Sequence, residues 1–179
     1  ALDFFQQAQA IQKRTNNRRQ EADTLDLIGA TYSAMGQPEK AISYHQEALK
    51  IQREAGNVRR EGISLANLGH VYLLLNQPDQ ALEQLNASVV IFRKISDLNS
   101  AAATLLDTAK AHQQKQDFDQ ARRDVEEAIG LVETVRARST SPQLRSAYLA
   151  SQENVYEFYI DLLMQLVAKN PGKGHDAEA

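Results

Sequence analysis

The chain has 179 residues, of which 42% are hydrophobic and 24% are charged, and its net charge is −3. This hydrophobic fraction is enough for a continuous folded core, and basic and acidic residues are mixed along the chain, so the charge favours neither nucleic acid nor an anionic membrane as a partner. There is no cysteine, which excludes disulfides, thiolate metal sites and cysteine nucleophiles. No stretch reaches the roughly 18 uncharged apolar residues of a membrane span.

A segment of similar sequence recurs every 40 residues from the first residue onward. It reads ALDFFQQAQAI from Ala1, AISYHQEALKI from Ala41, ALEQLNASVVI from Ala81 and ARRDVEEAIGL from Ala121. A period of this length, without insertions, is typical of an array of stacked structural repeats. The chain begins within a repeat rather than at a new one, so we expect it to be part of a longer protein.

A second type of segment alternates with the first. It reads LDLIGATYSAMGQPEKA from Leu25, LANLGHVYLLLNQPDQA from Leu65 and LLDTAKAHQQKQDFDQA from Leu105. Both types carry apolar residues at three- and four-residue spacing, which predicts helices. The apolar face of the segment from Leu25 contains Leu25, Ile28 and Tyr32.

The equivalent faces in the other segments follow the same spacing. They contain Leu65, Leu68 and Tyr72; Ile42, His45, Ala48 and Ile51; and Leu82, Leu85, Ser88 and Ile91. Small residues at Gly29, Gly69 and Ala109 are expected to face Ala41, Ala81 and Ala121, so that paired helices approach closely.

Tight turns are predicted between the two helices of each unit. Gly36 and Asn76 can adopt the left-handed conformation that ends a helix, and Pro38 and Pro78 suit the first turn of the next helix. In the third unit Asp117 is the expected N-cap.

The pattern Leu65-Ala-Asn-Leu-Gly-His-Val-Tyr72, followed by Ala81, resembles the tetratricopeptide repeat. Leucine replaces the usual tryptophan at Leu25, Leu65 and Leu105, and the proline that closes each unit in the family is absent. The 40-residue period is similar to the extended repeats of kinesin light chain and of the Leu-Gly-Asn-type cell-polarity adaptors. We expect the extra residues to lengthen the second helix.

This resemblance covers about residues 1–138 and implies an all-α fold, a right-handed α-solenoid of helical hairpins. Beyond it we expect a long C-terminal connector helix within residues 139–170, starting near Ser141-Pro142, and a linker or tail at residues 171–179. The segment VYEFYIDLLMQLV is apolar nearly all round, so we expect it to be covered on more than one side, by a following domain, a partner or a second copy.

The C-terminal segment is also similar to the connector that joins such repeats to the caspase-like CHAT domain in bacterial proteins. The matching residues are Ser141-Pro142, Leu144-Arg145, Tyr148, Tyr156 to Tyr159, Asp161-Leu162, and Pro171 to Asp176. The resemblance implies that a peptidase domain follows Ala179 in the parent protein. It also implies a bacterial origin, and the lack of cysteine is compatible with a cytoplasmic location.

In tetratricopeptide arrays the first helix of each unit lines a concave groove that holds partners. Transferring these groove positions to this sequence gives candidate peptide-binding residues at Asp23, Asp26, Ala30, Ser33, Asn67, His70, Leu73, Leu106, Asp107, Lys110 and Gln113. In related repeats an asparagine at the position of Asn67 holds the backbone of an extended peptide, because an amide can donate and accept at once. Solvation of an empty groove is the alternative interpretation. The family's basic clamp for a terminal carboxylate is not apparent, because Lys110 is nearly alone.

Other candidate sites have simpler explanations. The histidines His45, His70, His112 and His175 lie on different repeats or faces, and none forms an i,i+4 ligand pair, so we expect no metal. Arg18-Arg19 and Arg59-Arg60 form pairs that Glu21 and Glu61 are expected to neutralise within each repeat.

The sequence predicts neither a catalytic set nor a cofactor, because no nucleophile, base and Gly-rich loop converge. The leading interpretation is a protein-interaction scaffold that binds a peptide or protein and presents a C-terminal effector domain. The alternative is a structural spacer or oligomerisation module with an empty groove. Phe4, Phe5 and Ile11 have incomplete cover in the first helix, which predicts self-association through the end of the array.

Overall fold

The computed structural model of the protein describes residues 2–138 and 141–169. These residues form the helices α1 (Leu2–Arg14), α2 (Arg18–Ala34), α3 (Pro38–Glu54), α4 (Val58–Leu74), α5 (Pro78–Lys94), α6 (Leu98–Gln114), α7 (Phe118–Ala137), α8 (Pro142–Ser151) and α9 (Glu153–Lys169). No strand occurs in these two ranges, which confirms the all-α fold class. None of the described helices is long and apolar enough to cross a membrane. The expected tail at residues 171–179 lies outside the described residues.

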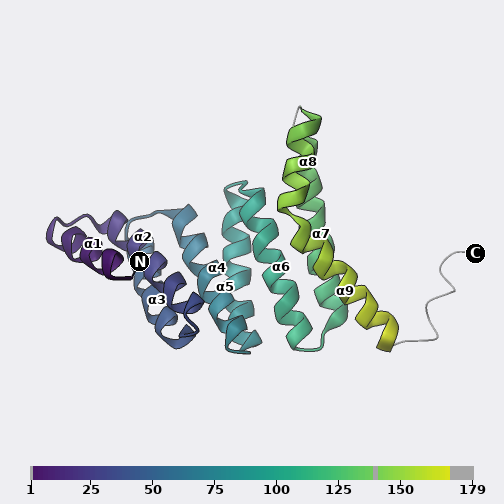
Figure 1. Ribbon diagram of the computed structural model, residues 1–179, viewed down its shortest axis with the longest axis horizontal. Coiled ribbons are helices and arrows are strands. Elements are labelled where there is room, and N and C mark those ends of the chain that lie inside the picture. Colours follow the sequence, from purple (N-terminus) through teal and green to yellow (C-terminus); the bar gives the residue numbers. More distant parts are fainter. Residues whose placement is uncertain (1, 139–140, 170–179) are drawn as a thin grey trace, which may run out of the picture.

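The helices form an elongated array in which each one packs beside its neighbours in the chain. Figure 1 shows them following one another from α1 at one end to α7, α8 and α9 at the other. Helices α2 and α3, α4 and α5, and α6 and α7 form hairpins, and the first helices α2, α4 and α6 also contact one another in sequence. This arrangement confirms the predicted solenoid, because each hairpin contacts only its neighbours.

The predicted apolar faces form the core of the array. Leu25 and Ile28 on α2 and Leu65 and Leu68 on α4 are at most 2% exposed. Each hairpin therefore buries its apolar stripe against the next, as the three- and four-residue spacing requires.

The turns between paired helices follow the prediction. Gly36 and Asn76 have φ angles of 70° and 54°, in the left-handed region, and Pro38 and Pro78 begin α3 and α5. Asp117 caps α7 by accepting a hydrogen bond from the backbone N–H of Gln120 at 3.1 Å.

The turns between successive hairpins use the same geometry. Asn16, Gly56 and Ser96 have φ angles of 53°, 64° and 57°. Asn17 and Asp97 then cap the helices that follow. The chain thus reverses every 20 residues by one type of turn, which accounts for the regular register of the array.

The two helices of each of the first two hairpins are of equal length, contrary to our expectation of a longer second helix. Helices α2, α3, α4, α5 and α6 each contain 17 residues. The prediction was therefore wrong for α2 to α5, where both helices share the long period equally. In the third hairpin the second helix, α7, is longer than α6, with 20 residues.

Close packing at the repeated glycines is confirmed, but the side chain that each glycine faces is not the expected one. A Cβ added to Gly69 would lie 2.4 Å from Leu85 Cγ and 3.3 Å from the carbonyl oxygen of Ala81, so no larger side chain fits without movement. At Gly29 the close neighbour is the ring of His45, with an added Cβ at 2.7 Å from its Nε2. Each glycine therefore makes room for the side chain four residues after the expected alanine. This side chain is His45 for Gly29 and Leu85 for Gly69.

The C-terminal segment forms two helices where we expected one. A turn at Gln152 separates α8 from α9. The hydroxyl of Ser151 donates to the carbonyl of Tyr148 at 2.6 Å, and such a local bond competes with the helical backbone pattern and favours a break. The sequence has no glycine or proline at this point, so the break was not predicted.

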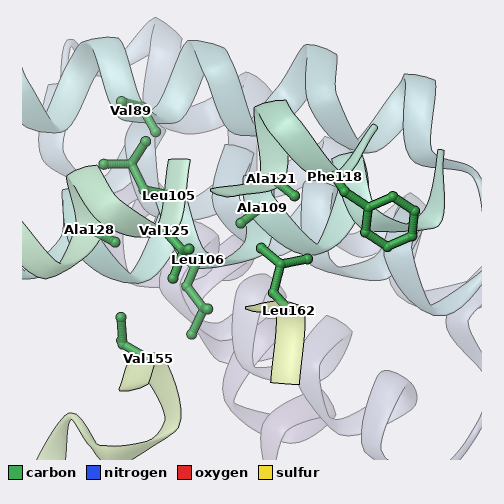
Figure 2. Close-up of a cluster of buried hydrophobic side chains, with 10 residues drawn as sticks. All are labelled: Val89, Leu105, Leu106, Ala109, Phe118, Ala121, Val125, Ala128, Val155 and Leu162. Carbon is green, nitrogen blue, oxygen red and sulfur yellow. The ribbon is translucent and has the colours of Figure 1, made fainter. Parts of the chain in front are cut away.

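Helix α9 belongs to the core of the array rather than lying apart from it. Val155 and Leu162 of α9 are buried in a cluster with Leu106 of α6 and Val125 of α7, and Figure 2 shows these side chains directed toward one another. The hydroxyls of Tyr156 and Tyr159 donate to Glu133 and Glu126 of α7 at 2.7 and 2.8 Å. Burial and the bond to Glu133 raise the pKa of Tyr156 to about 12.

Candidate peptide-binding groove

A hollow lies between the first helices of two successive hairpins, α2 and α4. Its volume is about 400 Å³. It is lined by the apolar residues Ala30, Ala34, Val71 and Leu74 and by the polar residues Ser33, His45, Asn67 and His70. The hollow therefore brings together Ala30, Ser33, Asn67 and His70, four residues that the sequence placed on the groove.

Polar groups in this hollow lack partners within the described part of the protein. The Oγ atom of Ser33 is shielded from solvent and makes no hydrogen bond there. The half-buried side-chain amide of Asn67 also forms no hydrogen bond with another described residue. The Oγ of Ser33 thus departs from the rule that buried polar groups are hydrogen-bonded, and the partly exposed amide of Asn67 is open to a ligand.

Asp26 is not available to a ligand, contrary to its prediction as a groove residue. It is 7% exposed, and its Oδ1 and Oδ2 accept hydrogen bonds from His45 Nδ1 at 2.7 Å and Ser64 Oγ at 2.6 Å. The three residues come from α2, α3 and α4 and link two successive hairpins. The sequence showed His45 as part of a packing face but did not show that a carboxylate would lie opposite it.

A second polar link crosses the groove between α4 and α6. Asp107 accepts hydrogen bonds from His70 Nδ1 at 3.3 Å and from Lys110 Nζ at 2.9 Å. The bond to Asp107 raises the pKa of His70, against partial burial and the charge of Lys110. Burial disfavours ionisation of Asp107, but the bonds from His70 and Lys110 outweigh it and lower the pKa of this carboxyl. These three candidate residues thus form one charged cluster, and Lys110 is not the isolated cation that the sequence suggested.

The candidates Leu73 and Leu106 are buried, so their prediction as ligand contacts was wrong. Leu73 packs with Leu85 in the core between hairpins, and Leu106 lies under α9. Gln113 is half-buried, and its Nε2 donates to Gln165 Oε1 of α9 at 3.2 Å. On α6, helix α9 therefore contacts two of the positions that were predicted to face a ligand.

Asp23 lies at the other end of the groove and is partly exposed. Its Oδ1 accepts from Gln52 Nε2 at 3.2 Å and lies 3.3 Å from Arg60 Nε. This carboxylate is accessible to a ligand, but it is already paired.

Arg18, Arg59 and Arg60 each form an ion pair, though not always within one repeat, whereas Arg19 pairs with none of the described residues. Arg18 pairs with Glu21 at 2.8 Å as predicted. Arg59 instead pairs with Asp97 at 3.0 Å, and Glu61 pairs with Arg53 at 2.8 Å. The expected pairing of Arg59-Arg60 with Glu61 was wrong, because the solenoid brings charges of neighbouring hairpins together.

The histidines share a feature that the sequence did not reveal. His45, His70 and His112 each place Nδ1 against an aspartate of another helix, with His112 lying 2.6 Å from Asp124. His175 lies outside the described residues. Within the described ranges no three acidic or histidine side chains gather as a metal site requires.

Solved structures of several repeat proteins are similar to this chain. The protein BtubC (BKLC) from P. vanneervenii is 18% identical with a TM-score of 0.63, and the match covers 89% of this chain and 68% of that one. A putative kinesin light chain from Podospora anserina with nearly identical tetratricopeptide-like repeats is 18% identical with a TM-score of 0.64, covering 94% of this chain and 86% of that one.

A third structure belongs to a larger assembly of domains. It is the signal transduction ATPase with numerous domains, with a tetratricopeptide repeat sensor, PH0952 from Pyrococcus horikoshii. It is 22% identical with a TM-score of 0.68, and the match covers 96% of this chain but 27% of that protein. At these identities the similarity shows a shared fold.

Comparison with curated proteins gives no match. The family model of the tetratricopeptide repeat matches residues 1–54 and 60–134, which span α1 to α7 except for the first residues of α4 and the last residues of α7. The reversal of the chain every 20 residues and the close helix contacts at Gly29 and Gly69 agree with this match. The chain belongs to the tetratricopeptide repeat family.

Proposed function

We propose that the chain is a protein-interaction scaffold that binds an extended peptide in the hollow between α2 and α4. The observation that carries this proposal is the presence of the unpartnered polar groups of Ser33 and Asn67 in a hollow with apolar walls. A peptide fits this hollow, because its backbone can both donate to and accept from the partly exposed amide of Asn67 while a side chain fills the apolar space. A rotation of the Ser33 side chain would also bring its hydroxyl to the peptide.

The walls of the hollow indicate what kind of side chain it accepts. Ala30 and Ala34 are short and exposed, and Leu74 is 53% exposed although it is apolar. A small or medium aliphatic side chain buries Leu74 and leaves Asn67 within reach of the peptide backbone. The His70, Asp107 and Lys110 cluster then lies beside the next part of the peptide toward α6.

We further propose that residues 1–138 form the binding array, that residues 139–170 cap it and connect it to an effector domain in the parent protein, and that residues 171–179 form the linker. The repeat sensor in the PH0952 protein supports such an arrangement, because that array is also part of a longer multidomain protein. More specifically, we propose that the parent protein is bacterial and cytoplasmic and that its effector is a CHAT-type domain.

A structural spacer or oligomerisation module is the second candidate function. Phe4 and Ile11 on α1 are 75% and 54% exposed, and this apolar surface favours self-association through that end of the array. The groove then requires no ligand.

Selection of peptides against the purified chain tests the proposal. We expect selected peptides to share an aliphatic residue and to lose about tenfold in affinity for Asn67→Ala, the effect of one lost buried hydrogen bond. Asn86→Ala, an exposed asparagine on α5, is the matched control and should bind as the unmodified chain does. Equal affinity for both variants would contradict groove binding and favour the spacer function.

A further inference from the structure

Helix α9 has an uncovered apolar face on the side opposite its core contacts. Val155 and Leu162 are buried against α6 and α7, whereas Ile160, Met164 and Val167 are 57%, 59% and 60% exposed. The exposed residues are spaced by four and three positions, so they lie on one face of the helix.

This face forms a shallow hollow of about 420 Å³, and the half-buried Leu163 completes its lining with Ala168. No polar side chain contributes to the lining. An apolar stripe of this length and spacing matches the apolar stripe of another helix, which packs its own i, i+3, i+4 and i+7 residues into such a groove.

Carboxylates run along one edge of the same face. Glu153, Glu157 and Asp161 are exposed and spaced by four residues, and none of them has an ion-pair or hydrogen-bond partner in the described ranges. Glu157 and Asp161 lie three residues before Ile160 and Met164, so each is a surface neighbour of the apolar stripe. The opposite edge is the packed side of α9, where Tyr159 and Leu166 contact the core.

The charges select among possible occupants of the face. An anionic lipid surface is disfavoured, because three unpaired carboxylates face it. A purely apolar helix leaves the carboxylates unpaired. An acidic helix is repelled by them. A helix with lysine or arginine along one side of its apolar stripe pairs with them, and such complementarity also speeds association.

We propose that the outer face of α9 is a docking surface for a basic amphipathic helix, separate from the peptide groove between α2 and α4. The apolar contacts of Ile160, Met164 and Val167 supply the buried surface, and Glu157 and Asp161 set the charge of the partner. This surface lies at the end of the array from which the chain continues beyond the described helices.

Binding of two matched synthetic helices to the chain of residues 1–179 tests the proposal. The probes are a Leu/Lys amphipathic peptide of about 18 residues, roughly the length of α9, and the same peptide with glutamate in place of lysine. Fluorescence anisotropy at about 0.15 M salt, where charges beyond roughly 8 Å are screened, measures both affinities. We expect the lysine peptide to bind at least about tenfold more tightly than the glutamate peptide.

Variants with matched controls locate the binding. Met164→Gln should weaken the lysine peptide by about tenfold or more, while Val90→Gln, at a 64% exposed apolar residue of α5, should leave the affinity unchanged. Glu157→Lys should reduce the preference for the lysine peptide, because it leaves only two carboxylates beside a new positive charge, and Glu83→Lys on α5 should leave the preference unchanged. All four sites are exposed, so circular dichroism should show an unchanged helix content for each variant.

Two results would overturn the proposal. One is equal affinity for the lysine and glutamate peptides, or for the chain with and without Met164→Gln. The other is self-association of the chain, measured by sedimentation, that Met164→Gln abolishes and the lysine peptide does not displace. The second result would assign the face to another copy of this chain.

Discussion

Asp26 and His45 are 19 residues apart in sequence, and Asp26 Oδ1 lies 2.7 Å from His45 Nδ1 in the interior of the array. The other carboxylate oxygen accepts from Ser64 in the next hairpin at 2.6 Å. One buried carboxylate thus joins α2, α3 and α4 below the hollow proposed as the peptide site. The link fixes the spacing of the two helices that form the walls of that hollow.

Asp26→Ala should therefore destabilise the protein strongly. Removing the carboxylate leaves buried His45 and Ser64 without their partner, which costs about 2–4 kcal/mol in free energy of unfolding. Urea denaturation followed by circular dichroism measures the change. Glu83→Ala, at an exposed carboxylate on α5, is the control and should change the stability by less than about 0.5 kcal/mol. Equal losses for the two variants would show that the buried hydrogen bonds of Asp26 contribute no more to the free energy of unfolding than an exposed carboxylate does.

Gly69→Ala and Gly130→Ala should change stability in opposite directions. The added methyl group at Gly69 meets Leu85 Cγ at 2.4 Å, and we expect a loss of about 1–3 kcal/mol from overpacking. Nothing lies within 4 Å of the corresponding position at Gly130, which is within α7. There alanine should stabilise the helix by up to about 1 kcal/mol. Thermal unfolding of both variants measures the signs, and a stabilised Gly69→Ala variant would contradict the close helix approach.

The pKa of His70 should depend on Asp107. Their hydrogen bond raises the pKa of His70 above its ordinary value of 6.5, so Asp107→Asn should lower it toward that value. Proton NMR titration of the imidazole measures the shift. An unchanged pKa would mean that the pair does not form in solution.

The same pair predicts the direction of a pH effect on stability. Because the folded protein holds the proton of His70 more tightly than the unfolded chain, the stabilisation is complete below pH 6.5 and is lost as the pH rises through the folded pKa. The difference in unfolding free energy between the unmodified chain and His70→Gln should therefore be larger at low pH. A difference that grows with rising pH would have the wrong sign.

Leu162→Ala tests whether α9 is part of the folded array. Leu162 is fully buried among α6, α7 and α9, and truncation of such a leucine costs about 2–5 kcal/mol. Met164→Ala, two residues away on the exposed face, should cost less than about 0.5 kcal/mol. Urea denaturation compares them. Similar small effects would indicate that α9 is a loosely attached connector.

The solenoid was predictable because its determinants are local and repeated. The apolar spacing, the left-handed positions at Gly36 and Asn76, and the prolines at Pro38 and Pro78 each specify a helix or a turn without reference to distant residues. Repetition at a fixed period then supplies the stacking.

The details of the groove were less predictable because they depend on contacts between helices. Whether Asp26 lies in the groove or in the core depends on the rotation of α2 against α3, and the presence of His45 opposite it decides the outcome. Leu106 and Gln113 appear open in the repeat pattern, but α9 covers the first and hydrogen-bonds the second. The position of α9 in turn depends on the break at Gln152, which has no glycine or proline to mark it.

The central claim is that the hollow between α2 and α4 holds a peptide. Titration of a selected peptide into isotope-labelled protein, followed by NMR, tests it most directly. We predict that the largest chemical-shift changes occur at Ala30, Ser33, Asn67 and His70, including the side-chain amide of Asn67. Changes confined to α3 and α5, with these four residues unaffected, would contradict the claim.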